Sequence, residues 1–293
     1  MISKNMDKSV IKVFINGFGR IGNTVYNLLK DDKSVMIAGI NELNPIQVDD
    51  VPILCEKDPT KLDLKDIDIV VQASGAYLKE EQNRLFLTQG AKKVLITAPS
   101  DAPTYLYGIN HDSYKGENII SGSSCSATAI VPVLKAFESF GIKGCYASMI
   151  HSYTNDQALL DRAKPYMDIR RTRSATLNIL PLYSTAPKAI KRFFPSIMID
   201  AKSIRVPLAY CTFYDITLLL ENKVTNFEDI VKQNLDYTYE KVVSSDFIGS
   251  KSAITVDMNF SYHDKKMLKI CGWQDNEVGY SAKLVELLKS VSS

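Results

Sequence analysis

A strand, a glycine-rich turn and a helix follow one another without interruption near the start of the chain. Residues 10–16 form a short apolar run rich in β-branched side chains, Gly17, Gly19 and Gly22 come next, and residues 23–30 have the pattern of a helix. Glycines at this spacing between a strand and a helix allow a tight turn and a close approach of the backbone to a pyrophosphate. The feature predicts a dinucleotide-binding α/β unit.

The rest of the chain before Cys125 alternates predicted strands with predicted helices. Strands are predicted at residues 35–41, 67–72 and 93–97, and a helix is predicted at residues 79–89. Because consecutive parallel strands need a crossover that is usually helical, this alternation favours a doubly wound parallel sheet of the Rossmann type.

The chain changes character after Cys125. Longer strands are predicted at residues 145–151, 211–221, 252–262 and 266–273, and an amphipathic helix at residues 276–291 closes the chain. This pattern is typical of an α+β domain with a mostly antiparallel sheet. We therefore expect one domain made of residues 1–124 with 274–293, which binds the dinucleotide, and a second made of residues 125–273.

Composition excludes several classes of protein. The chain has 293 residues, of which 45% are hydrophobic and 23% charged, as in ordinary globular proteins. Its 35 Lys and Arg nearly balance 33 Asp and Glu, which argues against nucleic acid as the main partner. Because it lacks a long apolar run and a signal-peptide pattern, we expect a cytoplasmic protein with no membrane contact. Five widely spaced cysteines without a C-x-x-C pair predict neither disulfides nor a metal site.

An acidic residue follows the glycine turn at the expected distance. Glu42 ends the second predicted strand, about 20 residues beyond the turn, where a carboxylate can accept the hydroxyls of an adenine ribose. The same carboxylate would repel a ribose phosphate, so NAD is favoured over NADP. A solvated glutamate at a strand end is the alternative interpretation.

Cys125 and His151 are candidates for a nucleophile and its base. Cys125 follows a stretch of small polar residues and begins a helical pattern, and a helix N-terminus can lower the pKa of a thiol. His151 ends a predicted strand and begins a polar loop, where a rigid element could present a base. From the residues alone, a structural cysteine and an unrelated histidine remain alternatives.

Six segments together resemble the phosphorylating glyceraldehyde-3-phosphate dehydrogenase family. They occur in the order and spacing of that family over nearly the whole chain, and they read NGFGRIG, SGSSCSATAIVP, HSYTNDQALLD, RRTRSATLNILP, IRVP and DNEVGYS. The resemblance implies a homotetramer that oxidises glyceraldehyde 3-phosphate with NAD and inorganic phosphate to 1,3-bisphosphoglycerate. It implies that Cys125 is the nucleophile and His151 the base. The reaction would pass through a thiohemiacetal and a thioester on Cys125.

The resemblance also implies the binding residues. Asn276 matches the residue that holds the nicotinamide carboxamide. The predicted cofactor contacts are Gly17, Phe18, Gly19, Arg20, Ile21, Gly22, Glu42, Ser74, Gly75, Thr97, Asn276 and Tyr280. The substrate phosphate is expected at Thr154, Asp156 and Arg205, and the attacking phosphate at Ser124, Ser126, Ser184 and Thr185.

The chain departs from the family pattern in several places. Ala127 and Thr128 replace a threonine and an asparagine after the nucleophile, Thr185 replaces a glycine, and Gln274 replaces the tyrosine before the D-N-E motif. A segment that relatives carry before Val51 is missing. Two alternatives therefore stay open: an enzyme like erythrose-4-phosphate dehydrogenase, in which water resolves the thioester, and a non-catalytic paralogue.

Overall fold

The computed structural model describes residues 10–154, 157–162 and 168–292, which form two compact units. The first unit is Met1–Ser123 with Ser281–Ser293, and the second is Ser124–Tyr280. Within the described ranges, no helix is long and apolar enough to cross a membrane.

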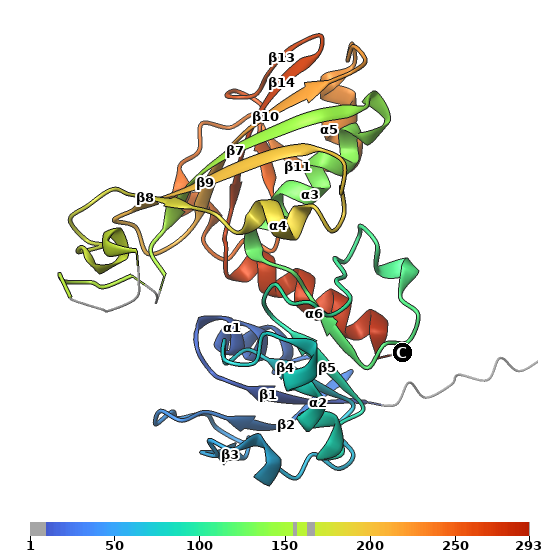
Figure 1. Cartoon of the computed structure of the whole chain (residues 1–293), viewed down its shortest axis with the longest axis vertical. Coiled ribbons are helices and arrows are strands. Elements are labelled where there is room, and N and C mark those ends of the chain that lie inside the picture. The colour runs from blue at the N-terminus through green and yellow to red at the C-terminus, as the bar shows by residue number, and fades with distance from the viewer. Residues whose placement is uncertain (1–9, 155–156, 163–167, 293) are drawn as a thin grey trace, which may run out of the picture. The chain divides into compact units, whose positions relative to one another are not determined.

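The first unit contains a six-stranded parallel sheet, drawn in blue and teal in Figure 1. Its elements are β1 (Ile11–Asn16), α1 (Arg20–Leu29), β2 (Val35–Asn41), β3 (Ile53–Leu54), η1 (Pro59–Lys61), β4 (Ile69–Gln72), α2 (Glu80–Thr88), β5 (Lys93–Ile96), η2 (His111–Ser113) and β6 (Ile119–Ser121). The strand order is β3-β2-β1-β4-β5-β6, which is the Rossmann order with its switch point between β1 and β4. The predicted doubly wound parallel sheet is confirmed.

The connection between β2 and β3 is short. Residues 42–52 contain no helix, and β3 is reduced to two exposed residues, Ile53 and Leu54, at the edge of the sheet. The sheet keeps all six strands despite the missing segment, because β3 still pairs with the end of β2 through Ile40 and Asn41.

The second unit contains an eight-stranded mixed sheet. Its elements are α3 (Cys125–Phe137), η3 (Glu138–Phe140), β7 (Ile142–Ser152), η4 (Ile169–Thr172), β8 (Leu180–Tyr183), α4 (Ala186–Ile190), β9 (Met198–Val206), β10 (Thr212–Leu220), α5 (Phe227–Asn234), β11 (Asp236–Thr238), η5 (Ser244–Phe247), β12 (Thr255–Asp257), β13 (Tyr262–Asp264) and β14 (Met267–Gln274). The order is β11-β12-β14-β10-β7-β9-β8, and β13 pairs with β14. Helix α6 (Val278–Val291) begins here and continues in the first unit.

Most strand pairs of this sheet are antiparallel, as predicted, but two are parallel: β7 with β9 and β11 with β12. Residues along β10 alternate between buried and more exposed positions, so one face of this sheet is packed in the interior of the unit. The predicted single strand at 252–262 is wrong. Asp257 interrupts it, since its carboxylate accepts a hydrogen bond from Asn259 N at 3.1 Å and its carbonyl accepts one from Ser261 N at 3.0 Å.

Candidate active site

A row of polar residues crosses four neighbouring strands of the second sheet. His151 on β7 is paired with Arg205 on β9 and with Thr212 on β10, and Thr212 is paired in turn with Gln274 on β14. His151, Thr212 and Gln274 are nearly inaccessible to solvent. Strand register therefore brings together residues that are more than a hundred positions apart in the sequence.

Cys125 is the first residue of α3. The hydroxyl of Ser124 caps this helix by accepting a hydrogen bond from Ala127 N at 3.2 Å, so the cysteine is held in the first turn. Burial raises the pKa of the Cys125 thiol, while the positive charge of Arg205 and hydrogen bonds from Ser126 act in the opposite direction. The backbone amides at the helix start do lower this pKa, as expected, but desolvation of the thiolate outweighs them and the pKa is raised overall.

His151 and Arg205 are in direct contact. Nη1 of Arg205 lies 2.5 Å from Nδ1 of His151 and donates to the carbonyl of Ser152 at 3.0 Å, while Nδ1 itself lies 2.7 Å from that carbonyl. A guanidinium has no acceptor, so the ring nitrogen must accept from it. A hydrogen bond from Nδ1 to the carbonyl of Ser152 needs the proton on Nδ1 instead, so the two contacts require opposite tautomers of His151.

Asn276 is held by two hydroxyls. Its Oδ1 accepts hydrogen bonds from Ser152 Oγ at 3.1 Å and Thr212 Oγ1 at 3.3 Å, so its Nδ2 is the end that can donate to a ligand. The preceding Asp275 fixes the backbone here, because its Oδ1 accepts from the amides of Glu277 and Val278 at the start of α6, each at 3.0 Å. Tyr280, one turn further, is buried.

The predicted phosphate residues are spread over different elements. Thr154 lies in the loop after β7, and its amide donates to Gln157 Oε1 at 2.8 Å. The Ser184 hydroxyl accepts a hydrogen bond from Ala186 N at 3.0 Å just before α4, and Thr185, the N-cap residue of that helix, is exposed. Asp156 lies outside the described residues.

Ser184 and Arg205 are not neighbours. The amide of Ser184 bonds to the carbonyl of Ala201, which is four residues before Arg205 along β9. Four extended residues span about 13 Å. A phosphate held by Arg205 is therefore distinct from one held by the Ser184 hydroxyl.

The glycine turn of the first unit has the geometry of a pyrophosphate site. Gly17 has φ +95° and a Cβ added there would lie 2.4 Å from Ser74 N, while a Cβ on Gly22 would lie 2.0 Å from the carbonyl of Gly17. A Cβ on Gly19 would meet nothing within 4 Å, so this position faces open space. No side chain caps α1. These features fit a dinucleotide whose phosphates lie against the helix N-terminus.

Glu42 is joined directly to this turn. Its Oε2 accepts a hydrogen bond from Phe18 N at 2.7 Å, and its Oε1 accepts one from Asn44 N at 2.9 Å. Burial raises the pKa of the Glu42 carboxyl, but the hydrogen bonds from Asn44 and Phe18 outweigh it and lower the pKa below its usual value. Glu42 is therefore a firmly anionic group beside the glycines.

Three amide side chains that sequence patterns did not single out line the same sheet edge. Asn41 Nδ2 donates to Asn16 Oδ1 at 2.8 Å, and Asn16 Nδ2 donates to Gln72 Oε1 at 3.2 Å, which links the ends of β1, β2 and β4. Gln72 also anchors two predicted cofactor contacts, because its Oε1 accepts from Ser74 Oγ at 2.8 Å and its carbonyl from Thr97 Oγ1 at 3.1 Å. The available signal was a polar residue at the end of each apolar strand.

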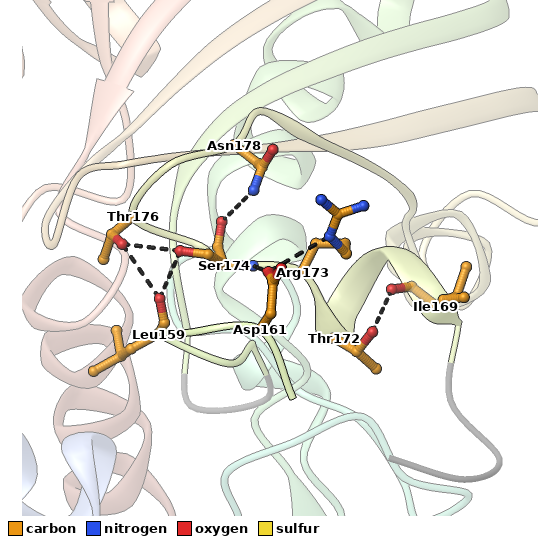
Figure 2. A network of polar contacts seen from close by, with 8 residues as sticks. All are labelled: Leu159, Asp161, Ile169, Thr172, Arg173, Ser174, Thr176 and Asn178. Atoms are coloured by element: carbon orange, nitrogen blue, oxygen red, sulfur yellow. Dashed lines mark hydrogen bonds and ion pairs between the residues drawn. The ribbon is translucent and has the colours of Figure 1, made fainter. Parts of the chain in front are cut away.

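An arginine-rich segment after His151 forms a compact polar network, shown in Figure 2. Ser174 Oγ donates to the carbonyl of Leu159 at 2.7 Å and Ser174 N to Asp161 Oδ1 at 2.7 Å, while Arg173 pairs with Asp161 at 3.5 Å. Asn178 Nδ2 donates to the carbonyl of Ser174 at 2.9 Å. These bonds join residues before and after the undescribed stretch 163–167.

Comparison with known proteins agrees with these features. A family model described as the C-terminal domain of glyceraldehyde 3-phosphate dehydrogenase matches residues 124–276. The chain is 32% identical to glyceraldehyde-3-phosphate dehydrogenase of Helicobacter pylori (strain J99 / ATCC 700824), with 94% of this chain and 98% of the relative covered. It is 32% identical to that of Geobacillus stearothermophilus, with 97% and 98% covered, and 33% identical to that of Haloarcula vallismortis, with 96% and 98% covered.

The lengths of these alignments locate the shortening within the shared fold. The alignment with the Helicobacter protein extends over 328 positions, more than the 293 residues of this chain. The relatives therefore carry segments that this chain lacks.

Proposed function

Since the chain belongs to the glyceraldehyde-3-phosphate dehydrogenase family, we propose that it is an NAD-dependent enzyme that converts glyceraldehyde 3-phosphate and inorganic phosphate to 1,3-bisphosphoglycerate. The observation that carries the proposal is the contact of Arg205 with His151, together with the charge of Arg205 acting on Cys125. A nucleophile, a base and a phosphate-binding cation are thus coupled within one unit.

We propose that binding of the substrate phosphate prepares the base. A guanidinium binds phosphate through forked, charge-assisted hydrogen bonds, which would draw Arg205 away from Nδ1 of His151. Nδ1 then carries the proton and donates to the carbonyl of Ser152, which already lies 2.7 Å away. In this tautomer, which the ring reaches by exchanging its proton with water, the lone pair lies on Nε2 and can accept the thiol proton of Cys125.

Covalent chemistry at Cys125 then divides the reaction into oxidation of the bound aldehyde and transfer of the resulting acyl group. The thiolate sulfur attacks the aldehyde carbon, and the protonated His151 returns its proton to the aldehyde oxygen, which gives a thiohemiacetal and a neutral His151. His151 removes the hydroxyl proton of this adduct as NAD, when bound, accepts the hydride, and a thioester remains on Cys125. An oxygen of inorganic phosphate attacks the thioester carbon, and the cysteine leaves as a thiolate.

The cofactor is assigned to residues whose geometry suits it. The glycine turn, with Phe18, Arg20 and Ile21, would hold the pyrophosphate, and the anionic Glu42 would accept the adenine-ribose hydroxyls. The fixed Oδ1 of Asn276 leaves its Nδ2 to donate to the nicotinamide carboxamide oxygen. Ser74, Gly75, Thr97 and Tyr280 complete the predicted contacts.

A homotetramer is proposed as the working assembly, as the family resemblance implies. The network in Figure 2 supports a segment that exposes large apolar side chains. These side chains, with their exposed fractions, are Leu159 (57%), Leu160 (76%), Ile169 (75%), Leu177 (80%) and Ile179 (68%). Several exposed apolar side chains close together in the chain are typical of a protein contact surface, and sedimentation analysis of the purified chain tests the assembly.

The activity is tested by following NADH formation across a panel of aldehydes, with and without inorganic phosphate. We expect turnover with glyceraldehyde 3-phosphate that depends on phosphate. Turnover with erythrose 4-phosphate that is independent of phosphate would favour water as the acyl acceptor. Absence of turnover with every phosphorylated aldehyde would contradict an enzymatic function and favour the non-catalytic paralogue.

A further inference from the structure

Tyr214 is a fully buried tyrosine that no step described above uses. It lies on β10, two residues after Thr212, so both side chains point to the buried face of the sheet. A buried phenol requires a hydrogen-bond partner. Tyr214 Oη donates to Oε1 of Gln274 at 2.7 Å.

Gln274 connects Tyr214 to Cys125 through hydrogen bonds. It is the last residue of β14 and is buried, and its Nε2 donates to the main-chain carbonyl of Cys125 at 3.3 Å. The carbonyl of Cys125 can only accept, so the nitrogen of the Gln274 carboxamide must face it and the oxygen faces Tyr214. The Tyr214 hydroxyl, which donates to that oxygen, holds the carboxamide in this orientation.

The charge of Cys125 also acts on Tyr214. Burial raises the pKa of Tyr214 well above its ordinary value, and the negative charge of the Cys125 thiolate raises it further. Hydrogen bonds from Ser126 lower the pKa of both groups. Tyr214 is therefore a neutral donor throughout the working pH range, and it lies within electrostatic reach of the thiolate.

We propose that Tyr214 and Gln274 form a positioning pair for Cys125, in which the phenol orients the carboxamide and the carboxamide ties down the first turn of α3. The proposal rests on the proposed function, because it requires Cys125 to be the nucleophile. The family pattern has a tyrosine where this chain has Gln274. A tyrosine hydroxyl thus reaches this place from the neighbouring strand instead, and the carboxamide completes the connection.

The test uses Tyr214→Phe, Gln274→Met and the double variant of the full-length chain. Each is assayed for kcat and KM and for the pH midpoint of Cys125 alkylation by iodoacetamide, followed on the Cys125 peptide by mass spectrometry. We expect each single variant to lower kcat about tenfold, with KM for the aldehyde unchanged, because a misdirected nucleophile slows the reaction more than binding. The alkylation midpoint should move to higher pH, and the double variant should resemble the single ones.

Tyr146→Phe is the matched control, because Tyr146 lies on β7 of the same sheet and is 51% exposed. It should leave kcat and the midpoint unchanged. Wild-type kcat and midpoint in Tyr214→Phe would overturn the proposal, as would fully additive effects in the double variant. A loss of thermal stability without a change in kcat or midpoint would show a purely structural role and overturn it too. If the unmodified chain shows no turnover, the proposed function fails, and the alkylation midpoint still tests the pair.

Discussion

Arg205 and His151 occupy paired positions on β9 and β7, and Nη1 of the arginine lies 2.5 Å from Nδ1 of the histidine. The side chain expected to bind the substrate phosphate therefore also occupies one nitrogen of the candidate base before substrate arrives. Its charge also lowers the pKa of Cys125 against the effect of burial. Arg205 thus acts on the candidate base and the candidate nucleophile as well as on the substrate phosphate.

Replacing this group should alter the thiol as well as substrate binding. In Arg205→Gln the positive charge that favours the thiolate is lost, so the pKa of Cys125 rises and the pH midpoint of its alkylation moves to higher pH. KM for the phosphorylated aldehyde should rise by about 10- to 100-fold, because charge-assisted hydrogen bonds are lost. Arg192→Gln, at an exposed position, is the control. A midpoint that stays in place or falls would contradict the coupling.

Glu42→Gln should weaken the discrimination between the two nicotinamide cofactors. The substitution keeps the size of the side chain but removes the negative charge that repels a ribose phosphate. We expect the ratio of kcat/KM for NAD to that for NADP to fall about tenfold or more. Glu81→Gln on the exposed start of α2 serves as the comparison. An unchanged ratio would mean that Glu42 does not face the adenine ribose.

Two glycine substitutions should separate folding from cofactor binding. A Cβ on Gly22 lies 2.0 Å from the carbonyl of Gly17, so Gly22→Ala should lower the melting temperature and weaken NAD binding. A Cβ on Gly19 meets no protein atom within 4 Å, so Gly19→Ala should melt normally but bind NAD less tightly. Fluorescence titration with NAD measures the affinity of each variant, and thermal melting measures its melting temperature. A Gly19→Ala protein with unchanged NAD affinity would place the phosphates elsewhere.

An ion pair in the first unit should contribute to stability in a pH-dependent way. Asp32 pairs with Lys289 of α6, which is the main cause that lowers its pKa to about 2. Because the folded pKa lies below the unfolded value near 3.9, the stabilisation is complete above that value and is lost as the pH falls toward 2. Since the pair is partly exposed, we expect about 1 kcal/mol at pH 7.

Urea unfolding of Asp32→Asn at several pH values measures this contribution. The difference in unfolding free energy from the unmodified chain should shrink as the pH falls from about 4 to about 2. The adjacent, exposed Asp31→Asn is the control. A difference that is constant over this range would show that the charge of Asp32 is not responsible.

Much of the fold followed from local patterns because the glycine turn and the alternating apolar runs specify their elements directly. The strand at 252–262 did not, since the hydrogen bonds of Asp257 impose a turn on a sequence that is otherwise strand-like. Strand β9 was not predicted, so its parallel pairing with β7 was missed as well. It depends on a long connection whose ends meet only in the folded chain.

The site was predictable in its residue types but not in its contacts. The motifs identified Cys125, His151 and Arg205, but only strand register shows that Arg205 lies opposite His151. Tyr214 belongs to no motif, and Gln274 was identified only as a departure from the family pattern, because their contacts are hydrogen bonds between strands and the start of α3. The raised pKa of Cys125 likewise reflects burial, which the sequence pattern of a helix start does not reveal.

The most direct test of Cys125 as the nucleophile is the mass of the chain after reaction with glyceraldehyde 3-phosphate and NAD in the absence of inorganic phosphate. We expect a 3-phosphoglyceroyl adduct on the peptide that contains Cys125, its absence in Cys125→Ser, and its release as an acyl phosphate when inorganic phosphate is added. An adduct on another residue, or NADH formation that persists in Cys125→Ser, would contradict Cys125 as the nucleophile.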